Sequence, residues 1–214
     1  MPRRSASSWP QASYGPSSWR CLCSRRTASD ITRELVEALC ALHDDLTLAV
    51  YDLQADAERA ALLGVDKAPA LVVLGGPAHT DYGVRFYGIP SGYEFASLLE
   101  AIRMVGSDNV ELQPATQEFL AELAAPLRLQ VFVTPSCAYC PRAVILAHRL
   151  AYASPFVTAD AVEVTEFPEL GARYRVMGVP RTMIDEHVSV EGAAPEGQLL
   201  AKLIDAQRMA TPVG

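Results

Sequence analysis

The residues of this sequence best suited to chemistry are two cysteines, Cys137 and Cys140, separated by two residues. They follow the apolar run 131–133, which predicts a buried strand, and they precede a helical pattern that continues to residue 152. A thiol at a helix N-terminus lies among unpaired backbone N–H groups and at the positive end of the helix dipole, which both favour the thiolate. We therefore expect a dithiol redox site, with Cys137 as the attacking thiolate and Cys140 as the resolving thiol.

The alternative interpretation of the same pair is half of a metal or iron–sulfur site. Structural zinc sites usually take a second ligand pair of similar spacing, and the sequence contains no second Cys-x-x-Cys. We therefore predict no metal and no cofactor, and we keep a metal-binding or iron–sulfur module as the alternative. The remaining candidate ligands are scattered along the chain: Cys21, Cys23, Cys40, His43, His79, His148 and His187.

The elements that would position the dithiol follow from the patterns around it. An apolar helical run covers 144–152, a strand is predicted at 161–164, and a short helix at 167–174 begins near its proline. Pro180 then stands directly before an apolar strand, where its missing N–H costs no central ladder bond and its peptide bond can be cis. This order of strands and helices predicts an α/β fold.

The segment Cys137-Ala138-Tyr139-Cys140, followed by Gly178-Val179-Pro180, resembles the thioredoxin and glutaredoxin superfamily. More closely, residues 131–205 resemble the second half of the two-unit protein disulfide oxidoreductases, through 166–170 and 176–180. The resemblance implies a cis Pro180 packed against the dithiol, with Val179 and Pro180 gripping an extended substrate. Tyr139 and Pro135, in the loop around the dithiol, complete the expected substrate-binding residues.

The expected substrates are protein disulfides. Glutaredoxins carry a Gly-Gly-Ser/Thr-Asp stretch after the cis-proline that holds glutathione, and this chain has an unrelated sequence at 190–197. That departure speaks against a dedicated glutathione site. We also expect an electron donor of the thioredoxin-reductase type.

An internal repeat predicts two tandem thioredoxin-like domains, at 30–107 and 114–208. Residues 50–74 parallel 162–184, with Pro69 in the place of Pro180. The same spacing back from the dithiol leads to Arg26 and Ser29, so the first domain is expected to carry no dithiol.

Residues 1–29 differ in composition from the rest, being rich in Ser, Arg and Pro. We predict a disordered or irregular extension there, with an organelle transit peptide or a start misread in translation as alternatives. The segment 17–27 lacks the alternation of a strand, so the first domain is expected to lack its first strand.

Composition points to a reducing compartment and away from nucleic-acid and membrane partners. The net charge is −7, no apolar run reaches transmembrane length, and five cysteines occur without a secretory signal. We therefore expect a cytoplasmic protein that binds neither nucleic acid nor membrane.

Proton transfer at Cys140 needs an acid or a water chain nearby. Glu163 is the candidate, because it alternates with the apolar residues 162 and 164 and so points to the opposite face of the sheet. The competing interpretation is a solvated glutamate at a strand end.

Overall fold

The computed structural model describes residues 17–23, 27–107 and 110–210 of the 214-residue chain. Within them the elements follow in the order β1 (Ser17–Cys23), α1 (Thr27–Cys40), β2 (Leu46–Asp52), α2 (Ala57–Leu62), β3 (Ala70–Gly75), β4 (Thr80–Tyr87), α3 (Glu94–Ser107), α4 (Pro114–Glu122), β5 (Leu127–Val133), α5 (Cys140–Ala153), β6 (Val157–Glu163), α6 (Pro168–Arg173), β7 (Arg181–Ile184), β8 (Val188–Glu191) and α7 (Glu196–Ala210).

The strands form one eight-stranded sheet in the order β2-β1-β3-β4-β6-β5-β7-β8. The sequence of elements from β1 to α3 occurs again from β5 to α7, with α4 between the two sets. The sets meet where β4 and β6 pair in parallel, from Val84 opposite Ala159 to Tyr87 opposite Val162. We call the two sets the N-terminal half and the C-terminal half, and the β4–β6 junction the seam.

The expectation that the first strand is missing was wrong. Residues Ser17–Cys23 form β1, which pairs in parallel with β2 and antiparallel with β3. The irregular extension predicted for 1–29 therefore does not hold for this segment, nor for the start of α1 at Thr27. A strand with a neighbour on each side is held extended by two ladders of backbone hydrogen bonds, which do not require alternating side chains.

The elements predicted after the dithiol are confirmed, with different ends. The helix expected at 144–152 is α5, which begins at Cys140, and the strand expected at 161–164 is β6, which begins earlier at Val157. The short helix at 167–174 is α6. Helix α4 has no counterpart among the predicted elements.

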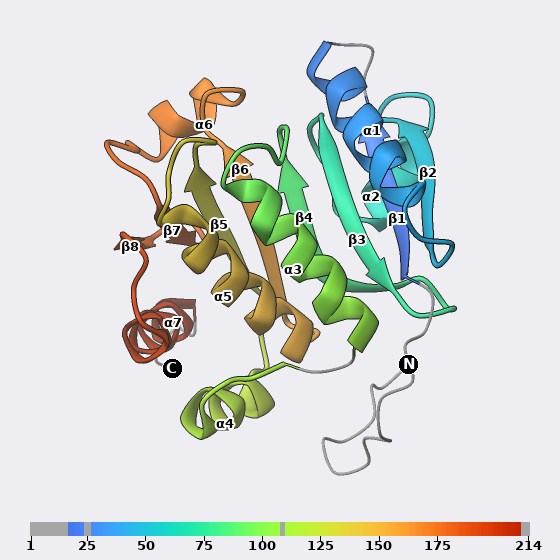
Figure 1. Ribbon diagram of the computed structural model, residues 1–214. Coiled ribbons are helices and arrows are strands. Elements are labelled where there is room, and N and C mark those ends of the chain that lie inside the picture. Colours follow the sequence, from blue (N-terminus) through green and yellow to red (C-terminus); the bar gives the residue numbers. More distant parts are fainter. Residues whose placement is uncertain (1–16, 24–26, 108–109, 211–214) are drawn as a thin grey trace.

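Helices α3 and α5 lie side by side across one face of the sheet, with both N-termini at the edge where β5 ends (Figure 1). Alternate residues of β4 and β6 build two cores. Val84, Phe86 and Ala161 pack on the α3–α5 face, and Tyr87 and Val162 pack on the opposite face. This arrangement brings the starts of two helices, one from each half, to the same edge.

His148 is a core residue of this seam rather than a ligand. It is buried in α5, its Nε2 lies 3.3 Å from the carbonyl oxygen of Arg85 in β4, and its ring meets Phe86 edge to face. Burial lowers the pKa of His148 to about 4, so the ring is neutral at pH 7.

No helix in the described ranges is both long and apolar enough to cross a membrane.

Candidate redox site

Cys137 and Cys140 form a disulfide at the N-terminus of α5. Cys137 is half-buried in the turn before the helix, whereas Cys140 is fully buried in its first turn. The backbone N–H of Cys140 points at the Cys137 sulfur, with nitrogen and sulfur 3.1 Å apart. An incoming disulfide can therefore reach Cys137 but not Cys140.

The start of α5 favours a negative charge on Cys137. Tyr139 at the N-cap makes no side-chain cap, the first turn carries no acidic residue, and Pro141 occupies a position where no N–H is needed. The Cys140 N–H and the positive end of the helix dipole therefore act on the Cys137 sulfur. Once the disulfide is reduced, such a helix start favours the thiolate form of the thiol next to it.

The loop expected to grip substrate lies beside this turn. The Val179–Pro180 peptide bond is cis, as is Ala68–Pro69 in the N-terminal half. Arg181 pairs with Phe132 near the end of β5, which places the preceding Pro180 next to the strand that leads into the dithiol. The contact expected between Pro180 and the Cys137 sulfur stays a prediction.

The side chains around the dithiol differ in accessibility. Tyr139 is 68% exposed and Met177, in the loop before Pro180, is 93% exposed. Val179 is half-buried and Pro180 is buried. The two exposed apolar side chains are suited to contact a bound polypeptide, and Met177 was not among the predicted site residues.

Pro135 is held by the N-terminal half. The N–H of Tyr93 donates to the Pro135 carbonyl oxygen at 2.9 Å, and Gly92 lies so close to Pro135 that an added Cβ would overlap it. Gly92 also has a φ of 59°, where a side chain is strained. Pro135 therefore connects the active-site turn to the loop before α3.

Glu94 is a functional candidate that the sequence patterns did not lead us to predict. It begins α3, is 3% exposed, and accepts a 2.8 Å hydrogen bond from Ser97 at Oε2. Its other oxygen, Oε1, is buried without a hydrogen-bond partner among the described residues. Burial raises the pKa of Glu94 to about 7, which suits a group that exchanges a proton near neutral pH.

A signal for Glu94 is present in the sequence. Glu94 is spaced three, four and seven residues from Ser97, Leu98 and Ala101, which are all buried. This helical period places the glutamate on the buried face of α3. A charged residue at such a position is unusual and often functional.

Glu163 shares the sheet face on which α5 packs, because it follows Ala159 and Ala161 in alternation and is itself buried. Its carboxylate accepts hydrogen bonds from the Thr165 hydroxyl, the Thr165 N–H and the Glu166 N–H, at 2.6, 3.2 and 2.7 Å. It is therefore not a solvated strand end but the anchor of the turn after β6. With both oxygens engaged there, Glu163 is less suited to proton transfer than Glu94.

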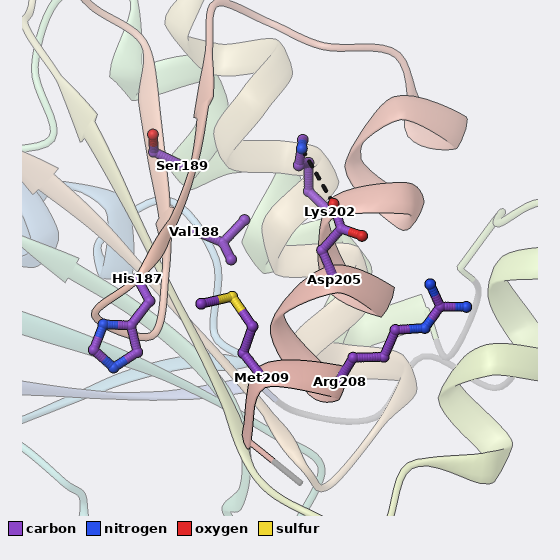
Figure 2. Close-up of a pocket in the computed structure, with 7 residues that line it drawn as sticks. All are labelled: His187, Val188, Ser189, Lys202, Asp205, Arg208 and Met209. Carbon is purple, nitrogen blue, oxygen red and sulfur yellow. Dashed lines mark hydrogen bonds and ion pairs between the residues drawn. The ribbon is translucent and has the colours of Figure 1, made fainter. Parts of the chain in front are cut away.

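A separate open pocket of about 470 Å³ lies between β8 and α7. The pocket lies next to the β7–β8 turn, at the opposite end of β7 from Pro180. Lys202 and Asp205, which both line it, form a 3.2 Å ion pair. Figure 2 shows His187 and Arg208 extending in opposite directions, so the charged groups do not converge on one ligand. In the described part of the chain, no three His, Cys, Asp or Glu side chains gather as a metal site.

Comparison with known proteins identifies the class. Residues 127–205 match the family model of the thioredoxin domain. The protein disulfide oxidoreductase from Aeropyrum pernix K1 superposes with a TM-score of 0.82 and 30% identity, over 90% of this chain and 86% of that one. The chain therefore belongs to the thioredoxin superfamily. Within it, the resemblance to protein disulfide oxidoreductases noted from the sequence is confirmed.

A second group of similar proteins consists of alkyl hydroperoxide reductases. The NTD_N/C domain of alkylhydroperoxide reductase from Enterococcus faecalis has a TM-score of 0.80 and 27% identity, over 90% of this chain and 91% of that one. A component of the alkyl hydroperoxide reductase of Pseudomonas aeruginosa is 28% identical over 123 residues, which are 58% of this chain and 24% of that protein. The chain thus spans about a quarter of the length of the curated relatives it matches.

Proposed function

We propose that this chain is a thiol–disulfide oxidoreductase that acts on protein disulfides through Cys137 and Cys140. The observation that carries the proposal is the disulfide at the start of α5, with one accessible and one buried sulfur. The similarity to a solved protein disulfide oxidoreductase over most of both chains supports it.

The reaction in the reducing direction takes two exchange steps. The Cys137 thiolate attacks one sulfur of the substrate disulfide, which forms a mixed disulfide and releases the other substrate sulfur as a thiolate. Cys140 then loses its proton, and its thiolate attacks the Cys137 sulfur. The second substrate sulfur leaves, the Cys137–Cys140 disulfide forms, and two electrons have passed to the substrate.

The proton of Cys140 needs an acceptor, because the thiol is buried away from water. We assign this role to Glu94 rather than Glu163. Glu94 has a raised pKa and an oxygen without a partner among the described residues, and its helix packs against α5. The N-terminal half would then supply the proton acceptor for a dithiol that the C-terminal half carries.

We further propose that the two halves are tandem thioredoxin-like domains. Their repeated element order and the two matching cis-prolines, Pro69 and Pro180, support this division. The first domain would include β1 and would have no dithiol, since the first turn of α1 contains no cysteine. Of the two positions matched to the dithiol, Ser29 is buried in α1 and Arg26 lies outside the described residues.

The partners follow from this chemistry. Protein disulfides would be the substrates, a thioredoxin-reductase-type protein would supply electrons, and we expect both encounters in the cytoplasm. The relatives named for hydroperoxide reduction make the disulfide of a peroxide-reducing enzyme one substrate to assay.

Reduction of insulin in the presence of dithiothreitol tests the proposal. The wild-type protein should accelerate insulin precipitation, and Cys137→Ser should abolish the acceleration because the attacking sulfur is lost. Cys140→Ser should instead trap a mixed disulfide, detectable by mass spectrometry. A Cys137→Ser protein that forms the adduct, together with an inactive Cys140→Ser protein that forms none, would reverse the two roles.

A further inference from the structure

The loop between β4 and α3, residues 88–93, is held by the C-terminal half at two points. At one end, the Ile89 N–H donates to Oε1 of Glu166 at 2.7 Å, across 77 positions of the chain. At the other end, the Tyr93 N–H donates to the Pro135 carbonyl oxygen in the turn before the dithiol. Glu94 follows directly, so the placement of this loop sets where Glu94 enters α3.

Glu166 is itself held in place by its own half. The Glu163 carboxylate accepts the Glu166 N–H at 2.7 Å, which fixes the turn after β6. The Glu166 side chain then reaches across the seam to Ile89. A hydrogen bond from a backbone N–H to a carboxylate is stronger than one between neutral groups.

The loop packs closely against the side chains of this turn at Gly88. Gly88 has a φ of 93°, and an added Cβ would lie 2.6 Å from the Glu163 Cβ and 3.0 Å from Glu166 Oε1. Only glycine fits such a position. The two halves therefore meet here without space for an intervening side chain.

We propose that Glu166 is a positioning residue for the dithiol, because its hydrogen bond to Ile89 holds the loop through which Tyr93 bonds to Pro135, in the turn before Cys137, and from which Glu94 enters α3. This inference rests on the proposed oxidoreductase function. Glu166 touches neither sulfur in any described contact, and it would act through the loop alone.

Two substitutions of Glu166 separate the loss of its hydrogen-bond acceptor from the loss of its charge. Burial raises the pKa of Glu166 and the neighbouring Glu163 charge raises it further, whereas the hydrogen bond from the Ile89 N–H lowers it. Glu166→Ala removes both the charge and the acceptor, whereas Glu166→Gln removes only the charge. A difference between the two variants therefore reports the hydrogen bond to Ile89.

The experiment measures the pH profile of iodoacetamide alkylation of the reduced protein, together with kcat/KM for insulin. Glu166→Ala should shift the alkylation midpoint by about half a pH unit or more and lower kcat/KM about fivefold, while Glu166→Gln stays within about twofold of wild type. Gly88→Ala, which pushes the loop away from the other side, should shift the profile as Glu166→Ala does. Glu169→Ala, an exposed acid on α6, is the matched control and should behave as wild type.

Several outcomes would overturn the inference. One is a Glu166→Ala protein with the wild-type profile and kcat/KM, and another is a Glu166→Gln protein as impaired as Glu166→Ala. Should Glu166→Ala not fold, hydrogen exchange of wild-type Ile89 decides, since rapid exchange of that amide would exclude the hydrogen bond. The alkylation profile needs no substrate, so an inactive wild-type protein would refute the proposed function while leaving the test of Glu166 intact.

Discussion

At the scale of single residues, the start of α5 gives two cysteines different environments. Cys137 is half-buried and its sulfur accepts a hydrogen bond from the Cys140 N–H, whereas Cys140 is fully buried. The same edge of the sheet holds Glu94, whose burial keeps a proton on the carboxyl to a pH near neutrality. The identity of each residue comes from the sequence, but its role comes from its exposure.

Glu94 should make the protein less stable as the pH rises. Its pKa is raised from 4.5 to about 7, so the folded state is favoured by the neutral acid below pH 4.5 and loses that advantage as the pH rises through 7. The difference corresponds to about 3 kcal/mol at most. Glu94→Gln stays neutral and should therefore lose less stability than wild type between pH 4.5 and 8, measured by urea unfolding.

The matched control for this measurement is Glu118→Gln, which changes an exposed glutamate on α4. Its stability should follow the wild-type dependence on pH. An identical slope in Glu94→Gln and wild type would contradict the raised pKa of Glu94.

At the scale of elements, the unexpected strand β1 explains how the N-terminal half is completed. It lies between β2 and β3 and pairs with both along most of its length. Without it, the facing backbone groups of β2 and β3 would lack partners. A segment without the alternation typical of a strand thus occupies an interior place in the sheet.

Arg20→Pro should therefore destabilise the protein strongly. Arg20 pairs with Ala49 on one side and with Val72 on the other, and a proline there removes a ladder donor in a strand that has no open edge at this point. We expect a loss of about 3 kcal/mol in the free energy of unfolding. Arg20→Thr retains the N–H and should cost less than about 1 kcal/mol. Equal stabilities of the two variants would argue against β1.

At the scale of the whole molecule, the two halves share one sheet but differ in chemistry. The seam joins them through β4 and β6, and the loop at 88–93 brings the N-terminal half to the dithiol. The N-terminal half has cysteines of its own, Cys21, Cys23 and Cys40. Cys40 is half-buried in α1, and burial raises the pKa of its thiol, which makes it a poor nucleophile at neutral pH.

Replacing Cys21, Cys23 and Cys40 together by Ser should leave insulin turnover within about twofold of wild type, because the N-terminal half is expected to be redox-silent. The matched variant is Cys137→Ser, which should be inactive. A loss of most activity in the triple variant, at unchanged thermal stability, would mean that the upstream thiols relay electrons.

The sequence by itself determined the dithiol, its strand-to-helix setting, the superfamily and the repeat around Pro69 and Pro180. The dithiol and its setting depend on residue types within a few positions of one another. The repeat depends on a short pattern that occurs twice. Glu163 was identified by alternation on the correct face, but its hydrogen bonds to Thr165 and Glu166 could not be read from a strand pattern.

Only the tertiary structure decided the remaining points. Strand β1 exists because β2 and β3 supply hydrogen-bond partners far along the chain, which override the weak local preference of its residues. Glu94 and Glu166 gain their proposed roles from contacts between segments that are distant in sequence, as in the bond from Ile89 to Glu166. Local patterns predict which elements form. The free energy of packing decides which of their side chains are buried, and therefore which can act at the dithiol.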